Sequence, residues 1–191
     1  KVDILIVGSG CAGLYCALNL PKDKNILIIT KDIVEHSDSY LAQGGMCMLK
    51  DESDFESYFN DTMKAGHYEN NPDAVATMIN SSQDLVKDLI GFGVDFAKDE
   101  EGNLLFTREG AHSQNRILFH EDITGKEITS HLYEEAKKRD NITIKEHWTM
   151  VDIICQEDKC YGAVVKKDDE NLTVINANYT VLARSEEHTS E

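Results

Sequence analysis

Long apolar runs and positive charge are both scarce in this sequence. No apolar stretch approaches the roughly 20 residues that a membrane-spanning helix needs, so we expect no membrane partner. The 19 Lys and Arg residues are outnumbered by 35 Asp and Glu residues, which gives a formal net charge of −16. That balance argues against nucleic acid as a partner. With 191 residues, 41% of them hydrophobic, the chain can form one domain with a core, or part of a larger protein.

The cysteine pattern lacks both a C-x-x-C motif and an even count. The five cysteines are Cys11, Cys16, Cys47, Cys155 and Cys160. An odd number, with no secretory signal ahead of the first strand, predicts reduced thiols in a cytoplasmic protein. No His, Cys and Asp set has metal-ligand spacing, so we expect no metal site.

The most informative stretch is Asp3 to Gly13. Ile4 to Val7 are apolar without alternation, as in a parallel strand covered on both faces. Gly8, Gly10 and Gly13 then fit G-x-G-x-x-G, with a helix expected from about Ala12 to Leu20. Glycines at this spacing permit a tight turn, close approach of a pyrophosphate and close helix packing. We therefore predict a dinucleotide site; the alternative is a glycine-rich turn without a ligand. Cys11 in this turn is interpreted as a small filler, not a nucleophile.

The end of the second strand, Asn25 to Thr30, departs from the NAD pattern. An acidic residue usually contacts the ribose there, but Thr30 and Lys31 are not acidic and Asp32 comes slightly late. Lys31 would suit a phosphate or would be a solvated surface charge. The stretch that follows, His36 to Gly45, is polar and then glycine-rich, and we interpret it as lining a ligand, with an ordinary loop as the alternative.

The remaining pattern predicts scaffold. Ser53 is expected to cap a helix from Asp54 to Ala65, and Asn71-Pro72 to start another that ends near Gly91. Thr124 to Glu127 fits a capping box for a helix to about Arg139. Strand-like runs follow, listed as Ile142–Lys145, Thr149–Cys155, Tyr161–Lys166, Leu172–Ile175 and Tyr179–Ala183, the middle ones joined by polar turns into an antiparallel meander. A polar segment from Thr107 to Arg116 would orient a small charged substrate or be a solvated loop.

Three motifs together resemble the N-terminal part of the L-aspartate oxidase family, within the succinate dehydrogenase and fumarate reductase flavoprotein superfamily. They are Gly8-Ser9-Gly10-Cys11-Ala12-Gly13, the loop ending in Ala42-Gln43-Gly44-Gly45, and Thr107-Arg108-Glu109-Gly110-Ala111-His112-Ser113. The resemblance covers residues 3–183. It implies an α/β fold: a three-layer, Rossmann-like FAD-binding domain with a parallel sheet and an antiparallel meander, incomplete at its C-terminus.

The resemblance also implies a cofactor and site residues. FAD would be held by the first glycine motif, by the residues near the second strand and by the segment around Met150; the implied set is Gly8, Ser9, Gly10, Cys11, Ala12, Gly13, Lys31, Asp38, Ser39, Tyr40, Leu41, Ala42, Gln43, Gly44, Gly45 and Val151. Glu109 would orient the substrate amino group, with Thr107, His112 and Ser113 as further substrate contacts. Relatives that attach FAD covalently carry a histidine where this chain has Asp38, so the resemblance implies non-covalent FAD.

The implied reaction is oxidation of L-aspartate to iminoaspartate, with oxygen or fumarate as acceptor and quinolinate synthase as the next enzyme of NAD biosynthesis. The alternatives are a fumarate reductase or succinate dehydrogenase flavoprotein, or a truncated, non-catalytic FAD-binding module. The family's catalytic arginine lies further downstream than residue 183, so we expect the isolated chain to be inactive. Residues 184–191 match the translation of a sequencing-adapter oligonucleotide and are interpreted as a non-native tail.

Overall fold

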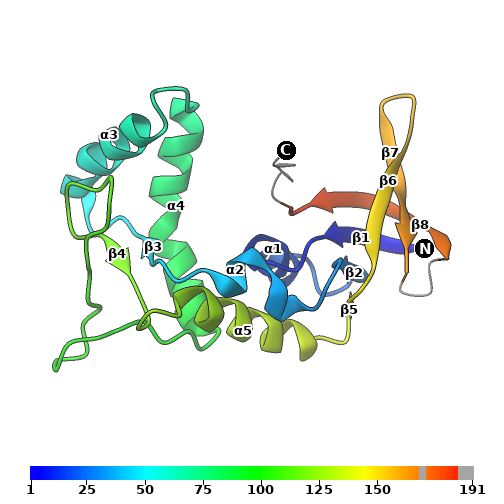
Figure 1. Cartoon of the computed structure of the whole chain (residues 1–191), viewed down its shortest axis with the longest axis horizontal. Coiled ribbons are helices and arrows are strands. Elements are labelled where there is room, and N and C mark those ends of the chain that lie inside the picture. Colours follow the sequence, from blue (N-terminus) through cyan, green and yellow to red (C-terminus); the bar gives the residue numbers. More distant parts are fainter. Residues whose placement is uncertain (168–170, 185–191) are drawn as a thin grey trace, which may run out of the picture. The chain divides into compact units, whose positions relative to one another are not determined.

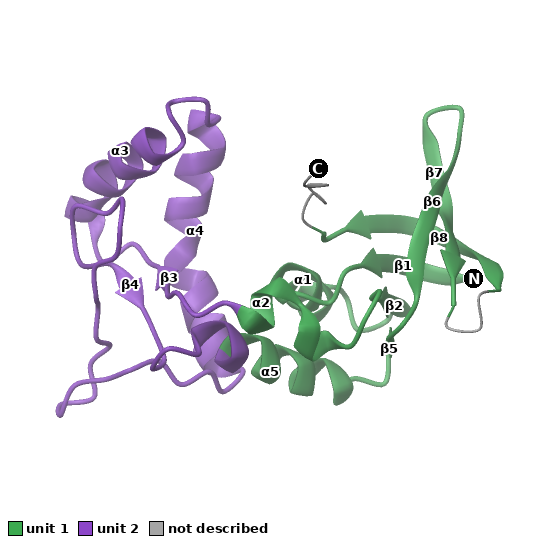
Figure 2. Cartoon of the chain, viewed as in Figure 1, with its two compact units in different colours: residues 1–41, 128–191 green, residues 42–127 purple. Residues whose placement is uncertain are grey.

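The computed structural model describes residues 1–167 and 171–184. They form two compact units (Figures 1 and 2): unit 1 contains Lys1–Leu41 and Ile128–Glu191, and unit 2 contains Ala42–Glu127. The predicted tail therefore lies outside the described residues except for Arg184.

Unit 1 is built on one six-stranded sheet in the order β5-β2-β1-β8-β7-β6. Its parallel part contains β1 (Val2–Val7), β2 (Ile26–Ile29), β5 (Ile142–Lys145) and β8 (Leu172–Leu182). An antiparallel meander joins β6 (Thr149–Gln156) and β7 (Lys159–Lys166) to β8. The α/β class and the combination of a parallel sheet with a meander are confirmed.

The strands with unbroken apolar runs form the centre of this sheet. All four residues of β2 are buried, as are Ile4 to Val7 of β1. Because both faces of these strands are covered, their sequence does not alternate. The helices of the unit are α1 (Cys11–Asn19), the short α2 (Asp38–Leu41) after a 3₁₀ turn at Val34–His36, and α5 (Thr124–Lys137), whose first turn belongs to unit 2.

Unit 2 combines helices with a small two-stranded sheet. Strands β3 (Met46–Cys47) and β4 (Ile117–Leu118) pair antiparallel. After a 3₁₀ turn at Glu52–Asp54 come α3 (Phe55–Ala65) and α4 (Pro72–Gly91), and their apolar faces meet in a core of Leu49, Tyr58, Met63, Val75 and Ile79. Asn71 caps α4 as predicted, its side chain accepting from the N–H groups of Asp73 and Ala74.

Several local predictions were wrong. Ser53 does not cap α3; Asp51 accepts from the Ser53 N–H and starts a 3₁₀ turn. Thr124 and Glu127 form no capping box, because the Thr124 hydroxyl accepts from the His120 N–H and the Glu127 carboxylate accepts from the Asp95 N–H.

Two strand predictions also differ from the structure. The last two predicted strands are one continuous strand, β8. The residues between them, 176–178, continue the strand, and Ala177 is buried on the same face as Ile175. The apolar run from Leu104 to Phe106, ahead of the polar segment, also predicts a strand, but the structure has only an isolated bridge there, between Leu104 and Lys98. Among the described residues, no helix is long and apolar enough to cross a membrane.

Candidate functional site

The turn between β1 and α1 leaves no room for a side chain at any of its three motif glycines. Gly8 has a φ of +114°, and a Cβ there would lie 2.3 Å from the Ala183 carbonyl oxygen. A Cβ on Gly13 would lie 2.0 Å from the Gly8 carbonyl oxygen, and one on Gly10 would lie 2.8 Å from the Ser39 hydroxyl oxygen. The three motif glycines are therefore required by close packing of the turn, the helix and the Ser39 segment.

The N-terminus of α1 opens directly from this turn. Gly10 is the N-cap and has no side chain to satisfy the first N–H groups of the helix. The Cys11 N–H donates to the Ser39 hydroxyl at 3.1 Å, which ties α2 to the start of α1. A helix start without a side-chain cap presents N–H donors and the positive end of the helix dipole to an anion.

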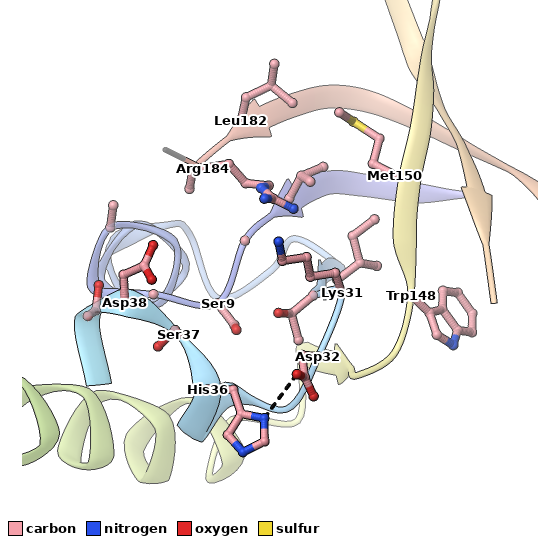
Figure 3. A pocket seen from close by; sticks show the side chains of 18 of the residues that line it. Ser9, Lys31, Asp32, His36, Ser37, Asp38, Trp148, Met150, Leu182 and Arg184 are labelled. Atoms are coloured by element: carbon pink, nitrogen blue, oxygen red, sulfur yellow. Dashed lines mark hydrogen bonds and ion pairs between the residues drawn. The ribbon is translucent and has the colours of Figure 1, made fainter. Parts of the chain in front are cut away.

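Beside the turn lies a cavity of about 780 Å³, lined within unit 1 (Figure 3). The Ser9 side chain lines it, and its buried hydroxyl has no hydrogen-bond partner in the described part of the chain. An unsatisfied buried hydroxyl is costly. The orphaned hydroxyl, the glycine cradle and the helix start together fit the phosphates of a dinucleotide.

The end of β2 supplies charged groups to the same cavity. Lys31 and Asp32 both line it (Figure 3). The Asp32 carboxylate accepts from the Ile33 N–H at 2.7 Å and pairs with the His36 ring at 3.0 Å. The hydrogen bond with His36, followed by that from Ile33, lowers the pKa of Asp32. Asp32 and His36 were not among the cofactor residues predicted from the sequence. The acidic residue directly after Lys31 indicated this position, although it comes slightly late for the usual ribose contact.

The structure brings together seven of the residues expected to bind a cofactor. The cavity is lined by Gly8, Ser9, Gly10, Ala12, Lys31, Asp38 and Ser39. Cys11, Gly13, Tyr40 and Leu41 belong to the same unit but do not line it. Val151 is 55% exposed, and its neighbour Met150 lines the cavity instead. Ala42, Gln43, Gly44 and Gly45 belong to unit 2.

In unit 2 the polar segment ends in a buried arginine. The Arg116 side chain is 0% exposed. Its guanidinium donates to Asp54 at 2.7 and 3.1 Å, to Asp61 at 2.6 Å and to the Ser57 hydroxyl at 2.6 Å. Asp61 also accepts from the N–H and the hydroxyl of Ser113, both at 2.7 Å. The network thereby holds the expected substrate residue Ser113 to α3.

His112 is fixed by the same network. Arg116 can only donate, so its 3.1 Å contact with His112 Nδ1 makes that nitrogen the acceptor. The other ring nitrogen, Nε2, then donates to the Cys47 sulfur at 3.2 Å. Burial raises the pKa of Cys47, and it raises that of Tyr58, which packs against both. His112 therefore links the buried ion cluster of Arg116 to Cys47, and Tyr58 packs against its ring.

The other two expected substrate residues, Thr107 and Glu109, come earlier in the same segment. Thr107 pairs with Ile117 through backbone hydrogen bonds of 2.9 and 3.1 Å. Glu109 is exposed, and a Cβ on Gly44 would lie 3.6 Å from its carboxylate oxygen. Gly45 is the more crowded of the two glycines, since a Cβ there would lie 2.3 Å from the Ile117 side chain. The loop from Thr107 to Ser113 and the Gly44-Gly45 pair are therefore neighbours within unit 2.

Comparisons with known proteins agree with a flavin-binding fold. An L-aspartate oxidase of Clostridium perfringens is 47% identical over 181 residues, covering 95% of this chain and 41% of that protein. One from Clostridium acetobutylicum is 40% identical, covering 96% of this chain and 42% of that protein. The chain thus spans about two fifths of the length of these curated relatives.

The solved structures show the same fold. A quinol fumarate reductase, FrdA, from E. coli superposes with a TM-score of 0.89 at 26% identity, covering 95% of this chain and 32% of that one. The sequence profile of the FAD binding domain family matches residues 3–188. The glycine turn and the cavity described above agree with this match. The chain therefore belongs to the FAD binding domain family, and its cofactor is FAD.

Proposed function

We propose that this chain is the FAD-binding part of an L-aspartate oxidase, which oxidises L-aspartate to iminoaspartate. The observation that carries the proposal is the similarity to curated L-aspartate oxidases, which reaches 47% identity over nearly the whole chain. The Thr-Arg-Glu-Gly-Ala-His-Ser segment at residues 107–113, which resembles the family's motif, also supports it. The cofactor, when bound, accepts a hydride from the substrate carbon.

The residues proposed to hold FAD are those around the unit 1 cavity. The Ser9 hydroxyl and the first N–H groups of α1 would take the pyrophosphate, and Lys31 would add a positive charge. Asp38 lines the cavity at the position where covalent relatives carry a histidine. A carboxylate cannot make that linkage, so we propose that FAD is bound without a covalent bond, and that it is released when the protein is denatured.

The residues proposed to handle the substrate lie in unit 2. The exposed Glu109 carboxylate would accept hydrogen bonds from the substrate ammonium group. Ser113 and His112 are held by the Arg116 network, so they would keep the loop in shape around Glu109. Arg116 itself is committed to two carboxylates and is not proposed to bind substrate.

The same proposal covers the electron acceptor and the cellular context. Oxygen, with release of hydrogen peroxide, or fumarate would reoxidise the cofactor. The product would pass to quinolinate synthase in NAD biosynthesis, in the cytoplasm.

The alternative is a fumarate reductase flavoprotein, which is supported by the close superposition on FrdA. The lower identity, 26% against 47%, and Asp38 count against it.

The experiment is an activity assay of the protein at its gene-encoded length, loaded with FAD. We expect hydrogen peroxide to be released from L-aspartate and not from succinate. Oxidation of succinate without oxidation of L-aspartate would overturn the proposal in favour of the alternative. A denaturing gel supplies the second test, because a protein band that keeps flavin fluorescence would contradict non-covalent binding.

A further inference from the structure

Two cysteines face each other at the tip of the β6–β7 hairpin. Cys155 of β6 and Cys160 of β7 are register partners, one step from the turn that Gln156 and Lys159 close. The two turn residues, Glu157 and Asp158, have φ values of 49° and 59°. Positive φ at both positions is the tight two-residue hairpin turn that keeps the flanking strands in register.

The register suits a disulfide. The ladder shifts register between Ile154 and Cys155, but Cys155 and Cys160 themselves remain directly opposite each other. Directly opposite residues of antiparallel strands have Cα atoms about 4.5–5.5 Å apart, and disulfides span Cα separations of about 4.4–6.8 Å. Each of the two thiols shifts the pKa of the other. The Cys160 thiol also donates to the Gly162 carbonyl at 3.7 Å. An S–S bond would therefore need little movement of the backbone.

The cysteine pair is accessible, and the pKa values of its two thiols are shifted in opposite directions. Cys155 and the four residues of the turn are exposed, and Figure 1 shows the hairpin tip extending past the rest of its sheet. The neighbouring Thr180 side chain, more than any other group, lowers the pKa of Cys160. Loss of hydration and the neighbouring Cys160 raise the pKa of Cys155. Burial raises the pKa of Cys16 and Cys47, which are in other parts of the fold.

We propose that Cys155 and Cys160 are an oxidation site, a dithiol that hydrogen peroxide converts reversibly into a disulfide. The Cys160 thiolate attacks one peroxide oxygen; the O–O bond breaks, hydroxide leaves, and a sulfenic acid forms. The Cys155 sulfur then displaces the sulfenic hydroxyl group, and the S–S bond forms. In total, two thiols and one peroxide give one disulfide and two waters. Only the source of the peroxide, the enzyme's own oxygen-dependent turnover, rests on the proposed function.

The test uses the whole chain under native conditions with added hydrogen peroxide. Trypsin cleaves after Lys145, Lys159 and Lys166, so the two cysteines end up in different peptides, residues 146–159 and 160–166. We expect these peptides to be joined after peroxide treatment and to separate on reduction with a thiol. Both peptides unlinked, or Cys160 linked to another cysteine, would overturn the proposal.

Variants assign the two roles. Cys155→Ser should lose the linked peptide and leave a sulfenic acid at residue 160 that dimedone traps, whereas Cys16→Ser should form the linked peptide as the wild type does. Dimedone labelling of residue 155 in Cys160→Ser, with none of residue 160 in Cys155→Ser, would contradict the assigned attack. The source is tested separately in the protein at its gene-encoded length, where L-aspartate and FAD replace the added peroxide, with and without catalase. A disulfide with added peroxide but none during turnover of L-aspartate keeps the site and rejects that source.

Discussion

Arg116 and Asp54 form a two-pronged ion pair in which the arginine side chain is 0% exposed and the aspartate side chain 5% exposed. Asp61 joins the same guanidinium at 2.6 Å, so one buried cation meets two carboxylates from the start and middle of α3. Tyr58 covers the guanidinium at 4.9 Å from its ring centre. The pair therefore ties the segment before β4 to α3 and the turn that precedes it.

Removing this cation should destabilise the chain strongly. Arg116→Met would leave two carboxylates without a counter-ion, and breaking a buried pair from one side costs about 3–5 kcal/mol. Arg108→Met is the matched control, since Arg108 is exposed in the same segment and surface changes stay within about 0.5 kcal/mol. The measurement is the free energy of unfolding in urea, and equal values for the two variants would show that the network contributes little.

The stability difference between wild type and Arg116→Met should shrink in acid. Burial alone would raise the pKa values of Asp54 and Asp61, but hydrogen bonds from Arg116 and from Ser57 or Ser113 outweigh burial and lower both. A carboxylate with a lowered folded pKa contributes stability above its unfolded pKa, about 3.9, and loses it as the pH falls through the folded pKa.

In Arg116→Met the same carboxyl groups are buried without a cation, so their pKa values should rise and protonation should favour the folded state. Urea unfolding of both proteins from neutral pH down to below about 4 gives the comparison. A difference that stays constant or widens on acidification would contradict the assigned charges.

Local sequence was sufficient to predict the position of the site in unit 1. An apolar strand without alternation, three glycines at fixed spacing and a following helix are all contained in the first 20 residues. The close contacts that Gly8 and Gly10 make with Ala183 and Ser39 come from distant parts of the chain and could not be read from this stretch. The cavity wall at Asp38 and Ser39 lies in the stretch from His36 to Gly45, whose polar and glycine-rich composition predicted a ligand-lining segment before the family resemblance added the individual residues.

The Arg116 network was not predictable in the same way. The segment from Thr107 to Arg116 is polar throughout, so its composition suits a solvated loop equally well. The burial of Arg116 depends on Asp54 and Asp61, which lie 62 and 55 residues earlier in the chain. Likewise, Thr124 and Glu127 have the capping-box spacing, but the Thr124 hydroxyl accepts from the nearby His120 N–H, and the Glu127 carboxylate accepts from the Asp95 N–H, 32 residues earlier.

A methyl group at Gly10 should weaken FAD binding. Its Cβ would lie 2.8 Å from the Ser39 hydroxyl oxygen, so Gly10→Ala would displace the group that accepts from the Cys11 N–H. We expect affinity for FAD to fall by about tenfold or more, equivalent to about 1.4 kcal/mol. Titration with FAD, followed by flavin fluorescence, measures it. Gly91→Ala is the control because nothing lies within 4 Å of its Cβ; equal affinity in both variants would exclude the cavity as the FAD site.

Glu109→Gln should separate substrate binding from folding. The carboxylate is exposed, so the neutral amide of similar size should leave the unfolding free energy within about 0.5 kcal/mol of wild type. If Glu109 accepts from the substrate ammonium, loss of its charge removes a charge-assisted hydrogen bond of about 1.5–3 kcal/mol, and KM for L-aspartate should rise about 10- to 100-fold. Steady-state kinetics of the gene-encoded enzyme, with Glu100→Gln as an exposed control in the same unit, gives the comparison. A fall in kcat with KM unchanged would mean that Glu109 acts after binding, and an unchanged enzyme would remove it from the substrate site.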